Sequence, residues 1–334
     1  MSRGKVFLIS GVSVLSILVL SFLLIQGSLK TLNKEEAVKR GVILSTKISL
    51  LVHQLQKERG RTAGFLGSNG EKFKSELFEQ RKLTDQAIQE LSKYLNKEFL
   101  SSLPPDAQRV FLSVVIDRLN ELTKVRQEVD SFKIDLKSAI KFYTSLINQL
   151  IDSVALVARH AESPQIAREL LSYADFMYAK DKAGIERAVL SVAFANDKFP
   201  NNDLFTKFVG LMAQQKAFIK AFLLGAPKNV ASYYKKTVLL SPSQAQVKNF
   251  ENLALSSPFQ GSFGVDPNLW FQVITKKIDL MHTVENYISK DLLKRITNEE
   301  EEAKTKLMEV VFVSLIALLA IVAFSFLSLK RKEG

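Results

Sequence analysis

The chain has 334 residues, of which 47% are hydrophobic, and it carries 46 Lys and Arg against 34 Asp and Glu, a net charge of +12. Its 14 Gly and 8 Pro are roughly half the average share, a composition that favours helix. Cys is absent, which excludes disulfides, iron–sulfur clusters and thiol nucleophiles, and the three His are too far apart in sequence to indicate a histidine-rich metal site.

The first predicted element is a membrane span at residues 6–29, which contain no charged side chain. A helix of this length crosses about 30 Å of hydrocarbon. The basic residues Arg3 and Lys5 before it are compatible with a secretory signal, but the apolar run exceeds the usual length of about 7 to 15 residues and lacks a small-residue cleavage site. We therefore expect an uncleaved anchor, with residues 1–5 in the cytoplasm.

Residues 30–309 form the predicted central domain, which carries 41 Lys and Arg against 33 Asp and Glu. Its few Pro residues leave long uninterrupted stretches without strand-like alternation, so the domain is predicted to be all-α. Long helices with short connections favour two antiparallel four-helix bundles that share long helices. The predicted helices lie near residues 31–66, 72–98, 105–130, 132–161, 165–196, 201–224, 228–238, 243–255 and 267–308, the last running into a second span.

Capping signals mark several of these helix starts. Ser163 and Ser241 each place a hydroxyl before a Pro at the first helical position, and Asp266 before Pro267 repeats the signal. Gln244 is expected to complete a capping box with Ser241. The clearest predicted loops are residues 67–70, 103–105 and 256–264.

The last predicted element is a second span at residues 310–329, which also lack charge. Basic residues follow at once in the tail at residues 330–334, as is typical of a cytoplasmic flank. We expect both termini in the cytoplasm and the central domain on the extracytoplasmic, periplasmic side of the inner membrane. The alternative is that both apolar stretches are buried core helices of a soluble protein, but their placement at either end of a polar domain argues against it.

An arginine interrupts the apolar stripe of the opening helix. Arg59 and Thr62 continue a 4-3-4-3-4 spacing of apolar residues, so they share one helical face. Gly60 and Gly64, one turn apart, would let another backbone or a ligand approach closely. The structural alternative is a buried Arg59 that pairs with Glu58 or another carboxylate.

A second stripe, near residue 180, has the same character. Lys180, Gly184 and Arg187 share a face with apolar residues, so the two cationic groups could converge over the gap at Gly184. The alternative is a close helix crossing at Gly184, with cations that only neutralise Asp181 and Glu186. Two glycine-relieved cationic stripes in one helical domain predict a pocket for a small anion between the bundles.

The segment LVHQLQKERGRTAGFL at residues 51–66 resembles the opening signature of the nitrate- and nitrite-sensing (NIT) domain family. Three later segments agree with that family in order: Gln80-Arg81 with Thr84-Asp85, KDKAGIERA at residues 180–188, and Trp270-Phe271 followed by Thr275 and Ile278-Asp279. The resemblance covers about residues 40–290, and four ordered segments are far more specific than any one of them.

This resemblance implies an all-helical sensor of two four-helix bundles that binds nitrate or nitrite between them through arginines and relays occupancy to a signalling module. Arg59 and Arg187 match the family's motif arginines, whereas Asp181 replaces the usual Glu and Lys277 stands where an Arg is common. The predicted ligand contacts are Arg59, Arg187, Lys180, Lys277, Arg81 and Thr62, and the predicted close-approach positions are Gly60, Gly64 and Gly184.

The five residues after the second span hold no output module. We therefore expect either the sensory part of a longer chemoreceptor or histidine kinase, or a stand-alone membrane sensor that acts through a cytoplasmic signalling partner. We also expect a homodimer in the lipid membrane, with no cofactor, no metal and no nucleic acid. The alternative is a membrane-tethered helical adaptor without a small-molecule ligand. An enzyme is not expected, because the sequence lacks a paired-carboxylate, triad or metal signature.

Overall fold

A computed structural model describes residues 3–96, 99–100, 109, 117–161 and 163–330. Within these ranges the chain is almost entirely helical and contains no β-strand, which confirms the predicted all-α class. The loop predicted at residues 103–105 and most of the first half of the helix predicted at 105–130 lie outside the described residues.

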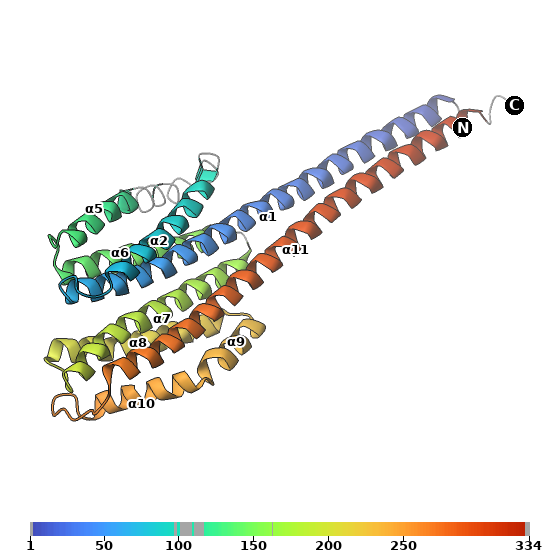
Figure 1. Ribbon diagram of the computed structural model, residues 1–334. Helices are drawn as coiled ribbons and strands as arrows, with labels where there is room; N and C mark the ends of the chain where they lie inside the picture. Colours follow the sequence, from blue (N-terminus) through green and yellow to red (C-terminus); the bar gives the residue numbers. More distant parts are fainter. Residues whose placement is uncertain (1–2, 97–98, 101–108, 110–116, 162, 331–334) are drawn as a thin grey trace. The chain divides into compact units, whose positions relative to one another are not determined.

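The central domain consists of two four-helix bundles (Figure 1). The first bundle comprises α1 (Arg3–Gly67), α2 (Lys74–Tyr94), α5 (Arg118–Asp130) and α6 (Leu136–His160). The second comprises α7 (Pro164–Ala195), α8 (Asn202–Gly225), the segment formed by α9 (Lys228–Tyr234), the π-helix η2 (Lys235–Leu239) and α10 (Pro242–Ser256), and finally α11 (Pro267–Lys330). Residues 41–292 form one compact unit that contains both bundles.

The predicted N-cap residues act as expected, but only half of the predicted capping box is present, because the Ser241 amide donates to the Val238 carbonyl at 3.0 Å. The Ser163 hydroxyl accepts from the Ile166 amide at the start of α7, and the Ser241 hydroxyl accepts from the Gln244 amide at the start of α10. Asp266 accepts from the Asn268 amide, so α11 also begins where the sequence predicts. Each interaction satisfies a backbone donor that the first turn of a helix leaves unpaired. Helix starts in this domain are therefore encoded locally.

An aromatic core fixes the position of α7 against α11 in the second bundle. Phe194 of α7 packs edge-on against Trp270 of α11, with ring centroids 5.6 Å apart, and both side chains are buried. The Trp270 Nε1 donates to the backbone carbonyl of Arg187 at 3.0 Å, so the indole has a polar partner as well as apolar contacts. This contact places the backbone at residue 187 relative to α11.

Polar contacts join the two bundles along α1 and α6 on one side and α7 and α11 on the other. Ser49 of α1 donates to Glu285 of α11 at 2.7 Å, and Tyr178 of α7 donates to Asp152 of α6 at 2.5 Å. Because Ser49 and Glu285 are both buried, the interface between the bundles is part of the interior. A site formed there draws residues from distant parts of the chain.

The remaining residues of α1 and α11, up to residue 40 and from residue 293, form a second compact unit. Within it, Lys39 pairs with Glu300 at 2.5 Å, and Lys304 pairs with the same carboxylate at 2.8 Å. Further along, large apolar side chains are exposed, including Phe22 and Phe312. Each helix has a stretch that is long and apolar enough to cross a membrane and is not buried in the protein. These features are consistent with membrane spans.

Candidate functional site

A cavity of about 300 Å³ lies between the bundles, where α1 and α6 face α7, α8 and α11. Because a water molecule occupies about 30 Å³ in the liquid, the cavity has room for a small ion with several waters. Among the described residues that line it, only Asp279 carries a carboxylate, whereas five side chains are cationic: Lys57, Arg59, Lys180, Arg187 and Lys207. The surplus of positive charge makes this cavity suited to an anion.

Arg59 enters the cavity from α1 and is held by two helices. Its Nη1 donates to Thr144 Oγ1 of α6 at 3.1 Å, and its Nη2 donates to Asp181 Oδ1 of α7 at 2.8 Å. Arg59 is buried and Asp181 is fully buried. The alternative to ligand contact was that Arg59 pairs with a carboxylate, and the structure shows that this carboxylate is Asp181. The same guanidinium nevertheless lines the cavity, so pairing and anion contact are compatible.

Glu58, the other carboxylate considered for Arg59, has different partners. Both of its oxygens accept from Arg126 of α5, at 2.7 and 2.8 Å, and Oε1 also accepts from the Tyr143 hydroxyl at 2.7 Å. Glu58 therefore belongs to the interior of the first bundle, and the next residue, Arg59, points to the other bundle. Consecutive residues on a helix point about 100° apart, which allows this division.

Arg187 enters the cavity from α7 and has no ion pair with any residue that the structure describes. Its Nη1 donates to Thr275 Oγ1 of α11 at 2.9 Å, and its guanidinium lies over the ring of Phe271 at 4.7 Å. Within the described part of the chain, no carboxylate lies within ion-pair distance of it. Burial, followed by the like charge of Arg59, lowers the pKa of Arg187 to about 10. The environment therefore opposes the charge of Arg187, and an added anion would favour that charge.

The two predicted glycines of the cavity lie opposite the two arginines. A Cβ atom on Gly60 of α1 would be 3.4 Å from Arg187 Nη2, and a Cβ atom on Gly184 of α7 would be 3.6 Å from Arg59 Nη2. Each guanidinium thus occupies the space beside the glycine of the opposite bundle. The close approach expected at these two positions is an approach by guanidinium groups: a Cβ at either position would be in van der Waals contact with one of them, and a longer side chain would compete with it for space.

Lys180 lines the cavity, but its ammonium group bonds to Glu285 of α11. Both side chains are fully buried. Burial alone would raise the pKa of Glu285, but the charge of Lys180 and hydrogen bonds from His282 and Lys180 lower it to about 2. Lys180 therefore neutralises a buried carboxylate and joins α7 to α11, in addition to its place in the cavity wall.

A stacked pair of imidazoles adjoins this ion pair. The rings of His53 of α1 and His282 of α11 are nearly parallel, with centroids 3.6 Å apart. Burial, followed by the charge of Lys180, lowers the pKa of His53 to about 2, so His53 is neutral at physiological pH. His53 lines the cavity as a neutral ring and adds no charge to it.

The structure places Arg81 and Thr62 away from the cavity. Arg81 lies in the first bundle, where its Nη1 donates to both oxygens of Asp130 at 2.9 and 2.8 Å. Thr62 is fully buried and does not line the cavity. The charge of Arg81 is already neutralised within its own bundle. These two predicted ligand contacts therefore remain apart from Arg59 and Arg187.

Lys277 and Gly64 also have other surroundings. Lys277 is buried in the second bundle, 3.8 Å from Glu251 of α10, and donates to Gln215 of α8 at 3.3 Å. A Cβ on Gly64 would lie 2.5 Å from the ring of Phe73, so this glycine makes room for an aromatic side chain of the connection to α2. Neither residue lines the cavity.

Several contributors to the site were not among the predicted ligand residues. Thr144 and Thr275 orient the two arginines, and Asp181 anchors the first of them. Thr275 and Asp279 are four residues apart and so share one face of α11, a spacing that can be read from the sequence. Thr144 had no such signal, because its role depends on packing between α1 and α6.

Comparisons with known proteins agree with this architecture. A family model described as nitrate and nitrite sensing matches residues 50–293. The chain is 25% identical over 272 residues to the nitrate regulatory protein of Klebsiella oxytoca, covering 78% of this chain and 65% of that protein. The chain thus spans less than two thirds of that relative's length.

A solved structure shares the fold. The structure of the NasR transcription antiterminator matches with a TM-score of 0.71 at 20% identity, covering 86% of this chain and 80% of that one. At this identity the similarity establishes the fold alone. The name of that neighbour describes an output in transcription, which differs from the membrane receptor expected from the sequence, so the expectation of no nucleic-acid partner stays a prediction.

The two helical bundles enclose a cavity with a surplus of cationic side chains, an arrangement suited to a small anion. Because the family model spans most of its length, the chain belongs to the nitrate- and nitrite-sensing (NIT) domain family. The resemblance detected in the sequence is thereby confirmed.

Proposed function

We propose that this chain is a membrane-anchored sensor that binds nitrate or nitrite in the cavity between its bundles through Arg59 and Arg187. One observation carries the proposal: two guanidinium groups from different bundles line one cavity, and Arg187 has no carboxylate partner among the described residues. Membership of the NIT family supplies the identity of the anion.

The free donors of the two arginines suit a flat oxyanion. Arg59 uses Nη1 and Nη2 for Thr144 and Asp181, whereas Arg187 uses Nη1 for Thr275. The Nη2 of Arg187 faces Gly60, where no side chain competes for it. A guanidinium edge can donate two parallel hydrogen bonds to two oxygens of one anion. Arg187 is therefore the principal ligand, and Arg59 adds charge from the opposite wall.

The size of the ligand limits its affinity. Nitrate has four heavy atoms, and the best small ligands gain about 1.5 kcal/mol per atom, so binding is expected to reach about 6 kcal/mol. This corresponds to a dissociation constant on the order of tens of micromolar. Sulfate, like nitrate, is an oxyanion that guanidinium groups bind, but it is larger and more strongly hydrated. It is therefore a useful test of the selectivity of the site.

The proposed signal arises because an anion changes the balance between the bundles. Arg59 and Arg187 repel each other, and an anion between them attracts both, which offsets the repulsion. A ligand shifts the equilibrium between two arrangements of the protein only by the difference between its affinities for them. Thr275, which orients Arg187, lies on α11, and this single helix continues to Lys330. We propose that α11 carries a small displacement through the second span, residues 310–329, to a signalling output.

Titration calorimetry of the purified full chain in a mild detergent tests the binding proposal. Nitrate and nitrite should give heat, with weaker or no heat from chloride and sulfate. Arg187→Gln and Arg59→Gln should weaken binding by about tenfold or more, the cost of a lost charged hydrogen bond. Arg81→Gln is the matched control, since it removes a guanidinium outside the cavity.

Two results would contradict the proposal. If the folded wild-type chain gives no nitrate or nitrite signal, the adaptor alternative is favoured. If Arg81→Gln weakens binding as much as Arg187→Gln does, the ligand does not bind in this cavity. Reporter fusions at each terminus test the proposed orientation, in which both termini are cytoplasmic and residues 30–309 are periplasmic.

A further inference from the structure

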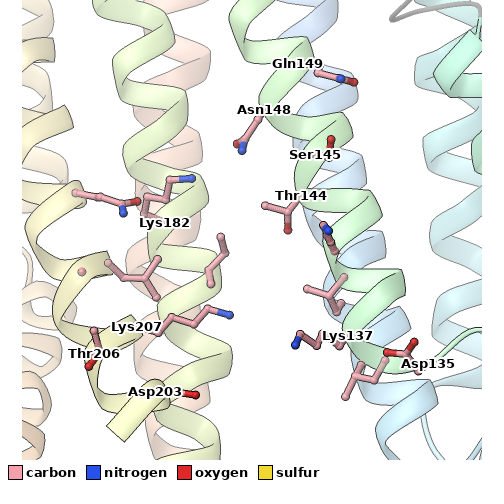
Figure 2. Close-up of a pocket in the computed structure, with 17 residues that line it drawn as sticks. Asp135, Lys137, Thr144, Ser145, Asn148, Gln149, Lys182, Asp203, Thr206 and Lys207 are labelled. Atoms are coloured by element: carbon pink, nitrogen blue, oxygen red, sulfur yellow. The ribbon is translucent and has the colours of Figure 1, made fainter.

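A groove of about 1430 Å³ runs along the surface beside the cavity (Figure 2). One wall is α6 with the residues that precede it, and the other is formed by α7 and α8. The groove is therefore another part of the boundary between the two bundles. Arg59 is buried and Arg187 is partly buried, so the ligand proposed above must enter the space between the bundles to contact both arginines.

The groove and the cavity share part of their lining. Ile140 of α6, Ile185 of α7 and Lys207 of α8 contribute to both. Two further groove residues contact Arg59 or the carboxylate that holds it. Thr144 accepts from Arg59 Nη1 at 3.1 Å, and Lys182 donates to Asp181 at 3.5 Å. The groove thus borders the residues that hold Arg59 in place.

Most of the charged side chains that line the groove are basic. Four lysines contribute to it, Lys137, Lys141, Lys182 and Lys207, against the two carboxylates Asp135 and Asp203. Figure 2 shows Lys137 extending from one wall and Lys182 and Lys207 extending from the other into the space between them. Asp135 is engaged in capping α6 through the Ser138 amide at 2.9 Å. The net field inside the groove attracts anions.

We propose that this groove is the entrance by which the anion reaches the cavity, and that Lys207, at the junction of the two, is a further anion-binding residue of the site. The inference rests on the proposed function. Lys207 is exposed, and in the described ranges no carboxylate lies within ion-pair distance of its ammonium group, so its charge is available to a ligand on either side of the junction.

The two roles have different kinetic consequences. Lys137 and Lys141 lie on the wall of the groove outside the cavity, so their charge raises the rate of association and its dependence on salt. Lys207 lines the cavity as well, so its charge also contributes to the stability of the bound state. Removing the outer charges should slow association and dissociation alike, whereas removing Lys207 should weaken the equilibrium affinity.

The single tryptophan of the chain provides a reporter for these rates. Trp270 donates to the carbonyl of Arg187, so its fluorescence should respond when an anion binds that arginine. In stopped-flow mixing of the full chain in detergent with nitrate at low ionic strength, the Lys137→Gln/Lys141→Gln double variant should associate about three- to tenfold more slowly. The Lys216→Gln/Lys220→Gln variant is the matched control, because these lysines are exposed on α8 outside the groove.

A steric block tests the route independently of charge. The chain contains no Cys, so Gly210→Cys introduces a unique thiol into the groove, and a Cβ there meets nothing within 4 Å. Coupling a bulky neutral maleimide to it should slow nitrate association by about tenfold or more, since the route itself is occupied. The same label on Lys216→Cys should have no such effect. Lys207→Gln should raise the equilibrium Kd about three- to tenfold.

The outcomes separate the entrance from the sensor. If wild type gives no nitrate signal by fluorescence or calorimetry, the proposed function fails and the entrance fails with it. If wild type binds nitrate but neither the label at position 210 nor the double lysine variant changes the association rate, the entrance lies elsewhere and the sensor proposal stands. An unchanged Kd in Lys207→Gln would remove that residue from the binding set.

Discussion

The guanidinium of Arg187 lies against Gly60 of the opposite bundle, at 3.4 Å from the position that a Cβ would take there. Arg59 and Gly184 repeat the relationship in the other direction at 3.6 Å. Each guanidinium thus lies in the space that a missing side chain of the opposite bundle leaves. Four residues from two helices, far apart in sequence, define the geometry together.

Replacing Gly60 with Ala should separate stability from binding. Ala is the better helix former, so the free energy of unfolding should rise by about 0.5 to 1 kcal/mol. The added methyl group would be in van der Waals contact with Arg187 Nη2 and would cover part of the space that this donor presents to a ligand, so nitrate affinity should fall. Gly210→Ala is the control, because its Cβ meets nothing within 4 Å and only the helix gain is expected. Calorimetry and urea denaturation measure both quantities, and equal nitrate affinity in the two variants would contradict the prediction.

The two arginines should differ in their contribution to stability. Arg59→Ala leaves the fully buried Asp181 without its guanidinium partner, so the expected loss in unfolding free energy is about 3 kcal/mol or more. Arg187→Ala removes a partly buried cation that has no carboxylate partner among the described residues, so the loss should be smaller. Urea denaturation without added anion checks this order. The opposite order would mean that Arg187 has an ionic partner in the folded protein.

The buried pair of Lys180 and Glu285 should show strong coupling. Lys180→Met leaves a carboxylate fully buried and should lower the unfolding free energy by about 3 to 5 kcal/mol. The Lys180→Met/Glu285→Leu double variant should recover much of this loss. For comparison, Lys82→Met breaks an exposed pair with Glu79 and should cost less than about 1 kcal/mol. Additive effects of the two buried substitutions in a double-mutant cycle would refute the coupling.

His53 should make the fold sensitive to acid. Its pKa is about 2 in the folded protein against 6.5 for an ordinary His, so between these values the unfolded chain binds more protons. The free energy of unfolding should therefore fall as the pH drops below 6.5, by up to about 1.4 kcal/mol per pH unit from this group. His53→Phe retains a ring against His282 but removes the titration, so its stability should decline less steeply. Denaturant unfolding at pH 7.5 and pH 5 measures the difference, and parallel declines would contradict it.

Local features of the sequence predicted the helices and their starts. The hydroxyl of Ser163 and the Pro that follows it act within one turn, so their effect does not depend on the rest of the fold. The apolar stripes were equally readable, because positions three and four apart share a helical face: Val52, Leu55 and Thr62 are all buried. Arg59 and Arg187 stood out because each interrupts such a stripe beside a glycine.

The partners of the charged residues could not be read in the same way. Nothing near Arg59 in the sequence identifies Asp181, more than a hundred positions away, as its carboxylate. Arg81 and Lys277 carry the same kind of charge as the cavity residues, yet Asp130 and Glu251 lie close to them in the bundles. Sequence patterns distinguish buried cations from exposed ones, but they do not show which cations are already neutralised.

The sequence by itself determined an all-helical domain, two apolar ends and two cationic stripes with room for close approach, because helix periodicity and capping are local properties of the chain. Only the tertiary structure decided that Arg59 and Arg187 face one cavity, that the cavity contains few carboxylates, and that Arg81, Thr62, Lys277 and Gly64 lie elsewhere. The reason is physical: the electrostatic environment of a buried charge is set by the side chains that packing brings within a few ångströms, and those side chains come from helices that the sequence alone does not place side by side.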